Sequence, residues 1–149
     1  MNSTRTLPQL ANQKFLTDGG LETWLIFDEG IDIPNFASFT LMEDANAVST
    51  MKRYFNNHLD IARRHGAGFI LESPTWRASK DWADLMGIDQ QRLKAMTTKA
   101  VEMMLELHDE APVDQPTIIV SGNVGPRGDG YNPAFQMTAD EAGVPVSVS

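Results

Sequence analysis

Residues 68–76 are Gly-Phe-Ile-Leu-Glu-Ser-Pro-Thr-Trp, a short apolar run that gives way to polar residues and a proline. Nearly continuous apolar runs of this length are typical of strands buried on both faces of a parallel sheet. Gly66, just before the run, is a natural end for the helical pattern that precedes it. This stretch therefore predicts a buried strand over Gly68–Leu71 whose carboxyl end carries Glu72.

Two other segments repeat this pattern of an apolar run followed by polar or glycine-rich residues. Phe15–Thr17 leads into the Asp-Gly-Gly of residues 18–20, and Ile118–Val120 leads into a loop over 121–131 that holds four glycines. The loop lacks the Gly-Lys-Ser/Thr ending of a P-loop, and its glycines do not have the spacing of a dinucleotide fingerprint. Neither of these nucleotide-binding motifs is therefore predicted.

Amphipathic helical patterns separate the three runs. The two longest cover about 45–65 and 89–112, with apolar side chains at steps of three and four and with an aspartate as N-cap of the second. Shorter helices are predicted over 21–30 and 79–86, whereas residues 35–41 are expected to be extended or loop. Strands that alternate with such helices predict βαβ units on a parallel sheet.

Two α/β architectures fit this series, a small doubly wound sheet and part of a (β/α)8 TIM barrel. A full barrel takes about 250 residues, and the chain has 149. The barrel interpretation is therefore a partial TIM barrel of about the first three β/α units, with parallel strands and amphipathic helices. Residues 1–14 are expected to be a flexible N-terminus, and 15–149 a truncated barrel domain. Thr138 and Glu141 have capping-box spacing and predict a further helix, and the residues after them are expected to be a premature ending.

Composition limits the kinds of partner. The chain has 12 Lys and Arg against 20 Asp and Glu, a formal charge of −8, which disfavours nucleic acid and anionic membrane surfaces. It has no cysteine, so neither a disulfide nor a thiolate metal site is expected within it. No apolar run approaches the ~20 residues of a membrane span. Since no secretory apolar region follows the N-terminus either, we expect a cytoplasmic protein.

The carboxyl ends of the strands supply the candidate binding residues, because ligands bind there in both architectures. Asp18 could pair with an ammonium group while the backbone N–H groups of Gly19 and Gly20 hold a carboxylate. The alternative is that Asp18 caps the following helix and the glycines make a tight turn. Glu72 faces either the site or solvent, and the loop that carries Asn123 is either part of the site or a wide turn.

The histidines and the single tryptophan at a strand end are weaker candidates. His58, His65 and His108 lie within or at the ends of the predicted helices. Surface or helix-terminal positions away from the strand ends are expected for them, rather than metal ligation. Trp76 either shapes a pocket or covers the sheet.

Taken together, three segments resemble the homocysteine S-methyltransferase family. They are TDGGLETWL at 17–25, RRHGAGFILESPTW at 63–76 and SGNVGPRGDGY at 121–131, in the family's order. The resemblance covers the chain from about residue 15 to residue 141 and implies a (β/α)8 barrel. It also implies the reaction, transfer of a methyl group from a sulfonium, betaine or folate donor to the homocysteine thiol, giving methionine.

The resemblance further implies a set of binding residues and a metal. The matched positions are Asp18, Gly19, Gly20, Glu72, Thr75 and Asn123. The first three match the part of the motif that holds the amino-acid end of homocysteine, and the others match positions lining the same cavity. Family members bind zinc through cysteines on later strands, and the zinc holds the substrate sulfur as a thiolate. Because this chain has no cysteine, we expect it to be inactive alone.

Three interpretations follow. The chain is the N-terminal part of a methyltransferase that a C-terminal chain complements, with open barrel edges that also favour self-association. Alternatively, it is a small non-catalytic α/β module that binds an amino acid, or the product of a decayed gene. A cysteine-bearing partner would favour the first, zinc-independent homocysteine binding the second, and the absence of both folding and binding the third.

Overall fold

The computed structural model describes residues 7–10, 12–126, 128–131 and 138. These residues form a mixed α/β fold around a three-stranded parallel sheet in the order β1-β2-β3. The strands are β1 (Phe15–Thr17), β2 (Gly68–Glu72) and β3 (Ile118–Ser121), so all three predicted strands are confirmed. Residues 1–6 and Glu141, the second half of the predicted capping box, lie outside this description.

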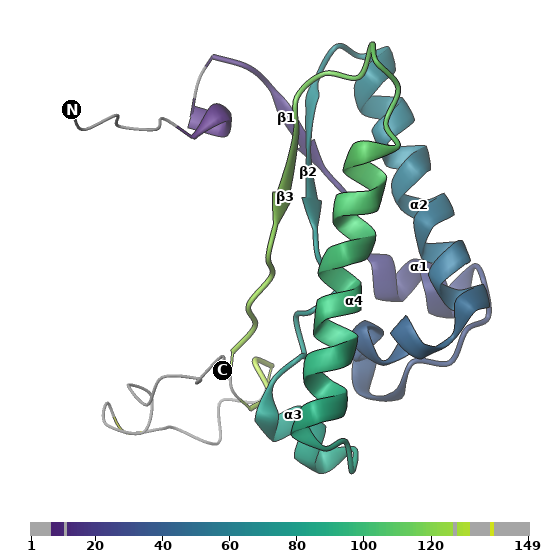
Figure 1. The fold of residues 1–149 in the computed structure, drawn as a ribbon, viewed down its shortest axis with the longest axis vertical. Coiled ribbons are helices and arrows are strands. Elements are labelled where there is room, and N and C mark those ends of the chain that lie inside the picture. Colours follow the sequence, from purple (N-terminus) through teal and green to yellow (C-terminus); the bar gives the residue numbers. More distant parts are fainter. Residues whose placement is uncertain (1–6, 11, 127, 132–137, 139–149) are drawn as a thin grey trace.

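Helices alternate with the strands, and the two long ones, α2 (Ala45–Arg64) and α4 (Gln90–Asp109), pack on one face of the sheet (Figure 1). The other helices are α1 (Leu21–Phe27) and α3 (Lys80–Leu85), and short 3-10 turns cover Pro8–Leu10, Pro34–Phe36 and Ser38–Glu43. Helices α2 and α4 contact each other beside the sheet. The side chains that are almost fully buried between these layers include Phe39, Phe55, Phe69, Leu25, Met51, Leu71, Met96, Met104 and Leu107.

The register of the sheet determines where the polar residues at the strand ends lie. Phe69 and Leu71 of β2 are fully buried, whereas Ile70 between them is only partly buried, because successive side chains of a strand point to opposite faces. Thr17 pairs with Ile70, and Glu72 pairs with Ser121. Parallel pairing therefore brings the carboxyl ends of all three strands to one end of the sheet.

The start of α4 and the end of α2 follow the predicted signals, whereas the cap at the start of α2 was not predicted. Asp89 caps α4, since its Oδ1 accepts the Arg92 N–H at 2.8 Å. Asp44 caps α2 in the same way and accepts the N–H groups of Asn46 and Ala47 at 2.8 and 3.3 Å. Gly66 has a φ of 60° just beyond α2, a left-handed conformation that favours glycine.

The α2 cap gives the first prediction. Replacing Asp44 by alanine removes the acceptor for two backbone N–H groups and should lower the free energy of unfolding by about 1 kcal/mol. Asp44→Asn keeps an accepting oxygen and should lose much less. Urea unfolding followed by circular dichroism measures both. Equal losses in the two variants would show that the charge of Asp44 matters and its capping bonds do not.

One predicted segment is wrong. Residues 35–41 were expected to be extended or loop, but the chain forms two 3-10 turns here, Pro34–Phe36 and Ser38–Glu43. Pro34 opens the first with its fixed φ, and Asn35 and Phe36 then adopt left-handed φ values of 56° and 55°. The second turn buries Phe39 and Met42, whose spacing of three matches the 3-10 period. Tertiary burial therefore decides the conformation of this segment.

Candidate functional site

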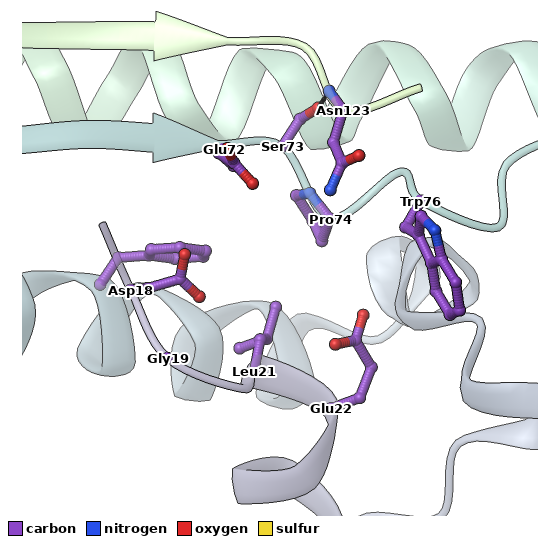
Figure 2. A pocket seen from close by; sticks show the side chains of 10 residues that line it. Asp18, Gly19, Leu21, Glu22, Glu72, Ser73, Pro74, Trp76 and Asn123 are labelled. Carbon is purple, nitrogen blue, oxygen red and sulfur yellow. Dashed lines mark hydrogen bonds between the residues drawn. The ribbon is translucent and has the colours of Figure 1, made fainter. Parts of the chain in front are cut away.

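A pocket of about 200 Å³ lies at the carboxyl ends of the strands (Figure 2). Three carboxylates from different elements line it: Asp18 after β1, Glu22 of α1 and Glu72 at the end of β2. Figure 2 shows the Asp18 and Glu72 side chains on facing sides of the pocket, with the Glu22 carboxylate turned toward the same space. The remaining lining residues are Gly19, Leu21, Phe55, Ser73, Pro74, Trp76 and Asn123. No lysine, arginine or histidine occurs among these described lining residues.

Tyr54 of α2 holds the Asp-Gly turn in place. Its hydroxyl donates to Asp18 Oδ2 at 3.2 Å, and the hydroxyl oxygen of Tyr54 accepts the Gly19 N–H at 3.2 Å. The Tyr54 ring is buried between Trp24 and His58, with centroid distances of 5.0 and 4.3 Å. One side chain therefore fixes both the Asp18 carboxylate and the backbone that follows it.

Asp18 does not cap α1. The N-cap of that helix is Gly20, which receives no side-chain capping bond. Of the two interpretations of Asp18, helix cap or polar group of a site, the structure places the carboxylate at the pocket. The Gly19 N–H, expected to be free for a ligand carboxylate, is used by the Tyr54 oxygen instead.

The electrostatics of the pocket centre on Asp18. Burial raises the pKa of the Asp18 carboxyl above its ordinary value and outweighs the hydrogen bond from Tyr54 and the charge of His58, which lower it. The negative charge of Glu72 raises the same pKa further. Burial, and then Asp18 itself, raise the pKa of Tyr54 strongly, so the tyrosine keeps its proton and Asp18 is the acceptor. A cation bound here would offset the repulsion between the carboxylates and favour the ionised form of Asp18.

A chain of hydrogen bonds joins the ends of β2 and β3. The Asn123 N–H donates to Ser73 Oγ at 3.1 Å, and the Thr75 hydroxyl donates to the Asn123 carbonyl at 2.7 Å. The Ser73 hydroxyl lies 2.8 Å from Thr75 Oγ1 and must be the donor, because the only proton of Thr75 is already used. Thr75 is buried and does not line the pocket, so it supports the site by joining its two loops.

This chain of bonds gives the second prediction. Thr75→Val has a similar shape but leaves the Asn123 carbonyl and the Ser73 hydroxyl proton without their partner. We expect a loss of about 1–3 kcal/mol in the free energy of unfolding. Thr75→Ser keeps the hydroxyl and serves as the control. Unfolding in urea followed by tryptophan fluorescence compares the variants, and a valine variant as stable as the serine variant would contradict the role of these bonds.

A second pocket of about 450 Å³ adjoins the first and shares Glu22 and Trp76 with it. Its other lining residues are Gly20, Thr23, Phe36, Arg77 and Tyr131. Trp76 lines both pockets, and the backbone at Gly125 packs closely against it. A Cβ added at Gly125 would lie only 1.9 Å from the Trp76 carbonyl oxygen. Glycine at 125 is therefore what lets the loop after β3 approach Trp76.

The six candidate residues thus have different positions. The first pocket is lined by Asp18, Gly19, Glu72 and Asn123, the second by Gly20, and neither by Thr75. The histidines lie on or at the ends of helices, as expected: His108 is in the last turn of α4, His65 is the C-cap of α2, and His58 lies within α2 and lines neither pocket. The His58 Nδ1 lies 2.9 Å from the Tyr54 carbonyl, one turn back along α2, and its ring packs on the tyrosine that holds Asp18.

Sequence reasoning missed Glu22 and Tyr54. Tyr54 lies among the apolar positions of α2, where a tyrosine usually needs a hydrogen-bond partner for its hydroxyl. That requirement was the available signal. Glu22 gave none, because an acidic residue in the first turn of a helix is common on electrostatic grounds alone.

No known family model, curated protein or solved structure matches the chain. In the part of the chain that the structure describes, no three His, Cys, Asp or Glu side chains are grouped in a way that could hold a metal ion. None of the described helices is long and apolar enough to cross a membrane.

Proposed function

We propose that the first pocket binds the ammonium end of an amino acid, and that the chain is the homocysteine-binding front part of a methyltransferase-like (β/α)8 barrel. One observation carries the proposal: Asp18, Glu22 and Glu72 line one pocket that has no basic side chain among its described lining residues, and one Glu22 oxygen accepts the Ser38 hydroxyl at 2.6 Å. Carboxylates form strong charge-assisted hydrogen bonds with ammonium groups. Their mutual repulsion makes the empty pocket less favourable than the cation-bound one.

The size and the walls of the pocket fit a small ligand. Its volume of about 200 Å³ lies below the ~300–1,000 Å³ typical of sites for drug-sized molecules. Leu21, Phe55 and Pro74 supply an apolar wall against which a short thiol-bearing side chain can pack. Homocysteine combines such a side chain with an ammonium group, and the resemblance of the three strand-end motifs points to the same substrate.

Methyl transfer needs more than this chain supplies. The zinc that activates the thiol in the resembling family is held by cysteines, and this sequence has none. The described residues also contain no alternative group of metal ligands, so they do not fit a zinc site. We therefore assign substrate binding to this chain, and we propose that a complementing chain supplies the thiolate-activating site.

Calorimetric titration of the chain with matched ligands tests the proposal. L-homocysteine should bind, and 4-mercaptobutyrate, which lacks only the amine, should bind at least about 10-fold more weakly because it loses the charged hydrogen bonds. A zinc chelator should change neither affinity. Equal binding of the two ligands, or no binding of either, would contradict the ammonium site.

The second candidate is a non-catalytic module that binds amino acids in general, favoured because the sequence has no cysteine and the described residues contain no group of metal ligands. L-norvaline separates the two candidates, since it replaces the thiol of homocysteine by a methyl group. Equal affinities for norvaline and homocysteine would favour the general module. A clear preference for homocysteine would favour the methyltransferase-like function.

A further inference from the structure

Arg77 is a buried cation with incomplete pairing. Its side chain is 8% exposed, and its guanidinium carbon lies 4.5 Å from the centroid of the Trp76 ring and 3.9 Å from that of Trp82. Within the described part of the chain, its Nε is buried and has no hydrogen-bond partner. Its contact with Asp129 is 3.5 Å long, beyond the usual hydrogen-bond range, and the Asp129 side chain is 43% exposed.

Such an arrangement is costly without a further partner. A buried charge is normally paired and hydrogen-bonded, because desolvation penalises it otherwise. Stacking on indole rings engages the face of the guanidinium and leaves its N–H groups, which lie in the guanidinium plane, for polar partners. A planar carboxylate matches that edge with two parallel hydrogen bonds.

The position of Arg77 links it to the amino-acid pocket. Arg77 lines the second pocket, which shares Glu22 and Trp76 with the first. Among the described residues that line either pocket, it is the one basic side chain. The Gly19 N–H, the other group expected to meet a ligand carboxylate, already donates to Tyr54.

We propose that Arg77 binds the carboxylate of a ligand in the second pocket, beside the carboxylates that hold an ammonium group in the first. The inference rests on the proposed function and extends it. The first pocket selects an ammonium group and the second a carboxylate, which belong either to one molecule or to two. The carboxylate belongs either to the same amino acid or to a second ligand. In both cases Arg77 determines specificity for an acid group.

Affinities for L-homocysteine and for 3-aminopropane-1-thiol, which lacks only the carboxylate, test this role. Arg77→Gln should weaken homocysteine binding by about 10-fold or more and change aminothiol binding by less than about 2-fold. Loss of packing alone would weaken both ligands equally. If the aminothiol-saturated chain binds propionate, and Arg77→Gln abolishes that binding, the carboxylate belongs to a second ligand.

Asp129→Asn provides an independent test at an exposed side chain, and it decides the matter if Arg77→Gln does not fold. Removing the competing charge frees Arg77, so homocysteine should bind several-fold more tightly while the aminothiol is unaffected. If the wild-type chain binds both ligands equally and binds no propionate, Arg77 is not a carboxylate site and the ammonium pocket stands. The same conclusion follows if neither variant changes the ratio of affinities or the binding of propionate. If neither ligand binds the wild-type chain, the proposed function itself fails.

Discussion

Asp18→Asn is expected to weaken L-homocysteine binding by about 10- to 100-fold, because it removes a charged partner of the ligand ammonium. The substitution preserves the shape of the side chain. Its amide oxygen can still accept the Tyr54 hydroxyl proton, so the Asp-Gly turn should remain in place. The effect therefore reports on charge rather than on local structure.

The same variant should not lose stability at neutral pH. Burial raises the pKa of Asp18 above its ordinary value of 3.8 in the folded chain. The group therefore contributes stability that is fully present below the ordinary pKa and is lost as the pH rises through the raised value. Asparagine carries no charge at any of these pH values. The variant should be at least as stable as wild type at pH 7, with a flatter dependence of stability on pH in the acid range.

The control for Asp18→Asn is Glu102→Gln, which removes one negative charge from the exposed face of α4. Calorimetry should give wild-type affinity for the control and weak binding for Asp18→Asn. If both variants bind homocysteine as tightly as wild type, Asp18 does not contact the ligand. If both bind it weakly, the net charge of the chain matters and the pocket does not.

Phe55→Ala is expected to lower the free energy of unfolding by about 3–5 kcal/mol. Phe55 is 1% exposed on α2, where its ring fills the core and forms one wall of the first pocket. Truncation would remove its buried apolar surface and leave a cavity that the sheet and the helices cannot close fully. A loss of this size is a large part of the total stability of a typical domain, which is about 5–15 kcal/mol.

Phe27→Ala is the matched control, since Phe27 at the end of α1 is 77% exposed. The control should change stability by less than about 0.5 kcal/mol. Urea unfolding of both variants measures the difference, and Phe55→Leu gives a milder core variant if the alanine variant does not fold. Equal losses for the two phenylalanines would show that α2 does not pack in the core as described.

The strands and long helices could be predicted from sequence because their signals are local. β2 follows from a run of apolar residues bounded by Gly68 and Glu72, and α4 from a capping aspartate, Asp89, ahead of an apolar stripe. The turn over Ser38–Glu43 could not be predicted, because the burial of Phe39 depends on how this turn packs against the distant helices α2 and α4.

The site was predictable only in part, for the same reason. Sequence order places Asp18 and Glu72 after strands, and parallel pairing then brings them together. The bond between Tyr54 and Asp18 joins residues 36 positions apart, so it depends on how α2 packs against β1. Three parallel strands fit a small doubly wound sheet as well as a barrel, so the TIM barrel stays a prediction.

Site-specific titration of the Asp18 carboxyl carbon by NMR, without and with saturating L-homocysteine, tests the central claim most directly. In the free chain the pKa of Asp18 should lie above 3.8. Bound homocysteine should lower it, because the ammonium group stabilises the carboxylate and the coupling between proton and ligand is reciprocal. A pKa that homocysteine leaves unchanged would show that the ligand ammonium does not bind at Asp18.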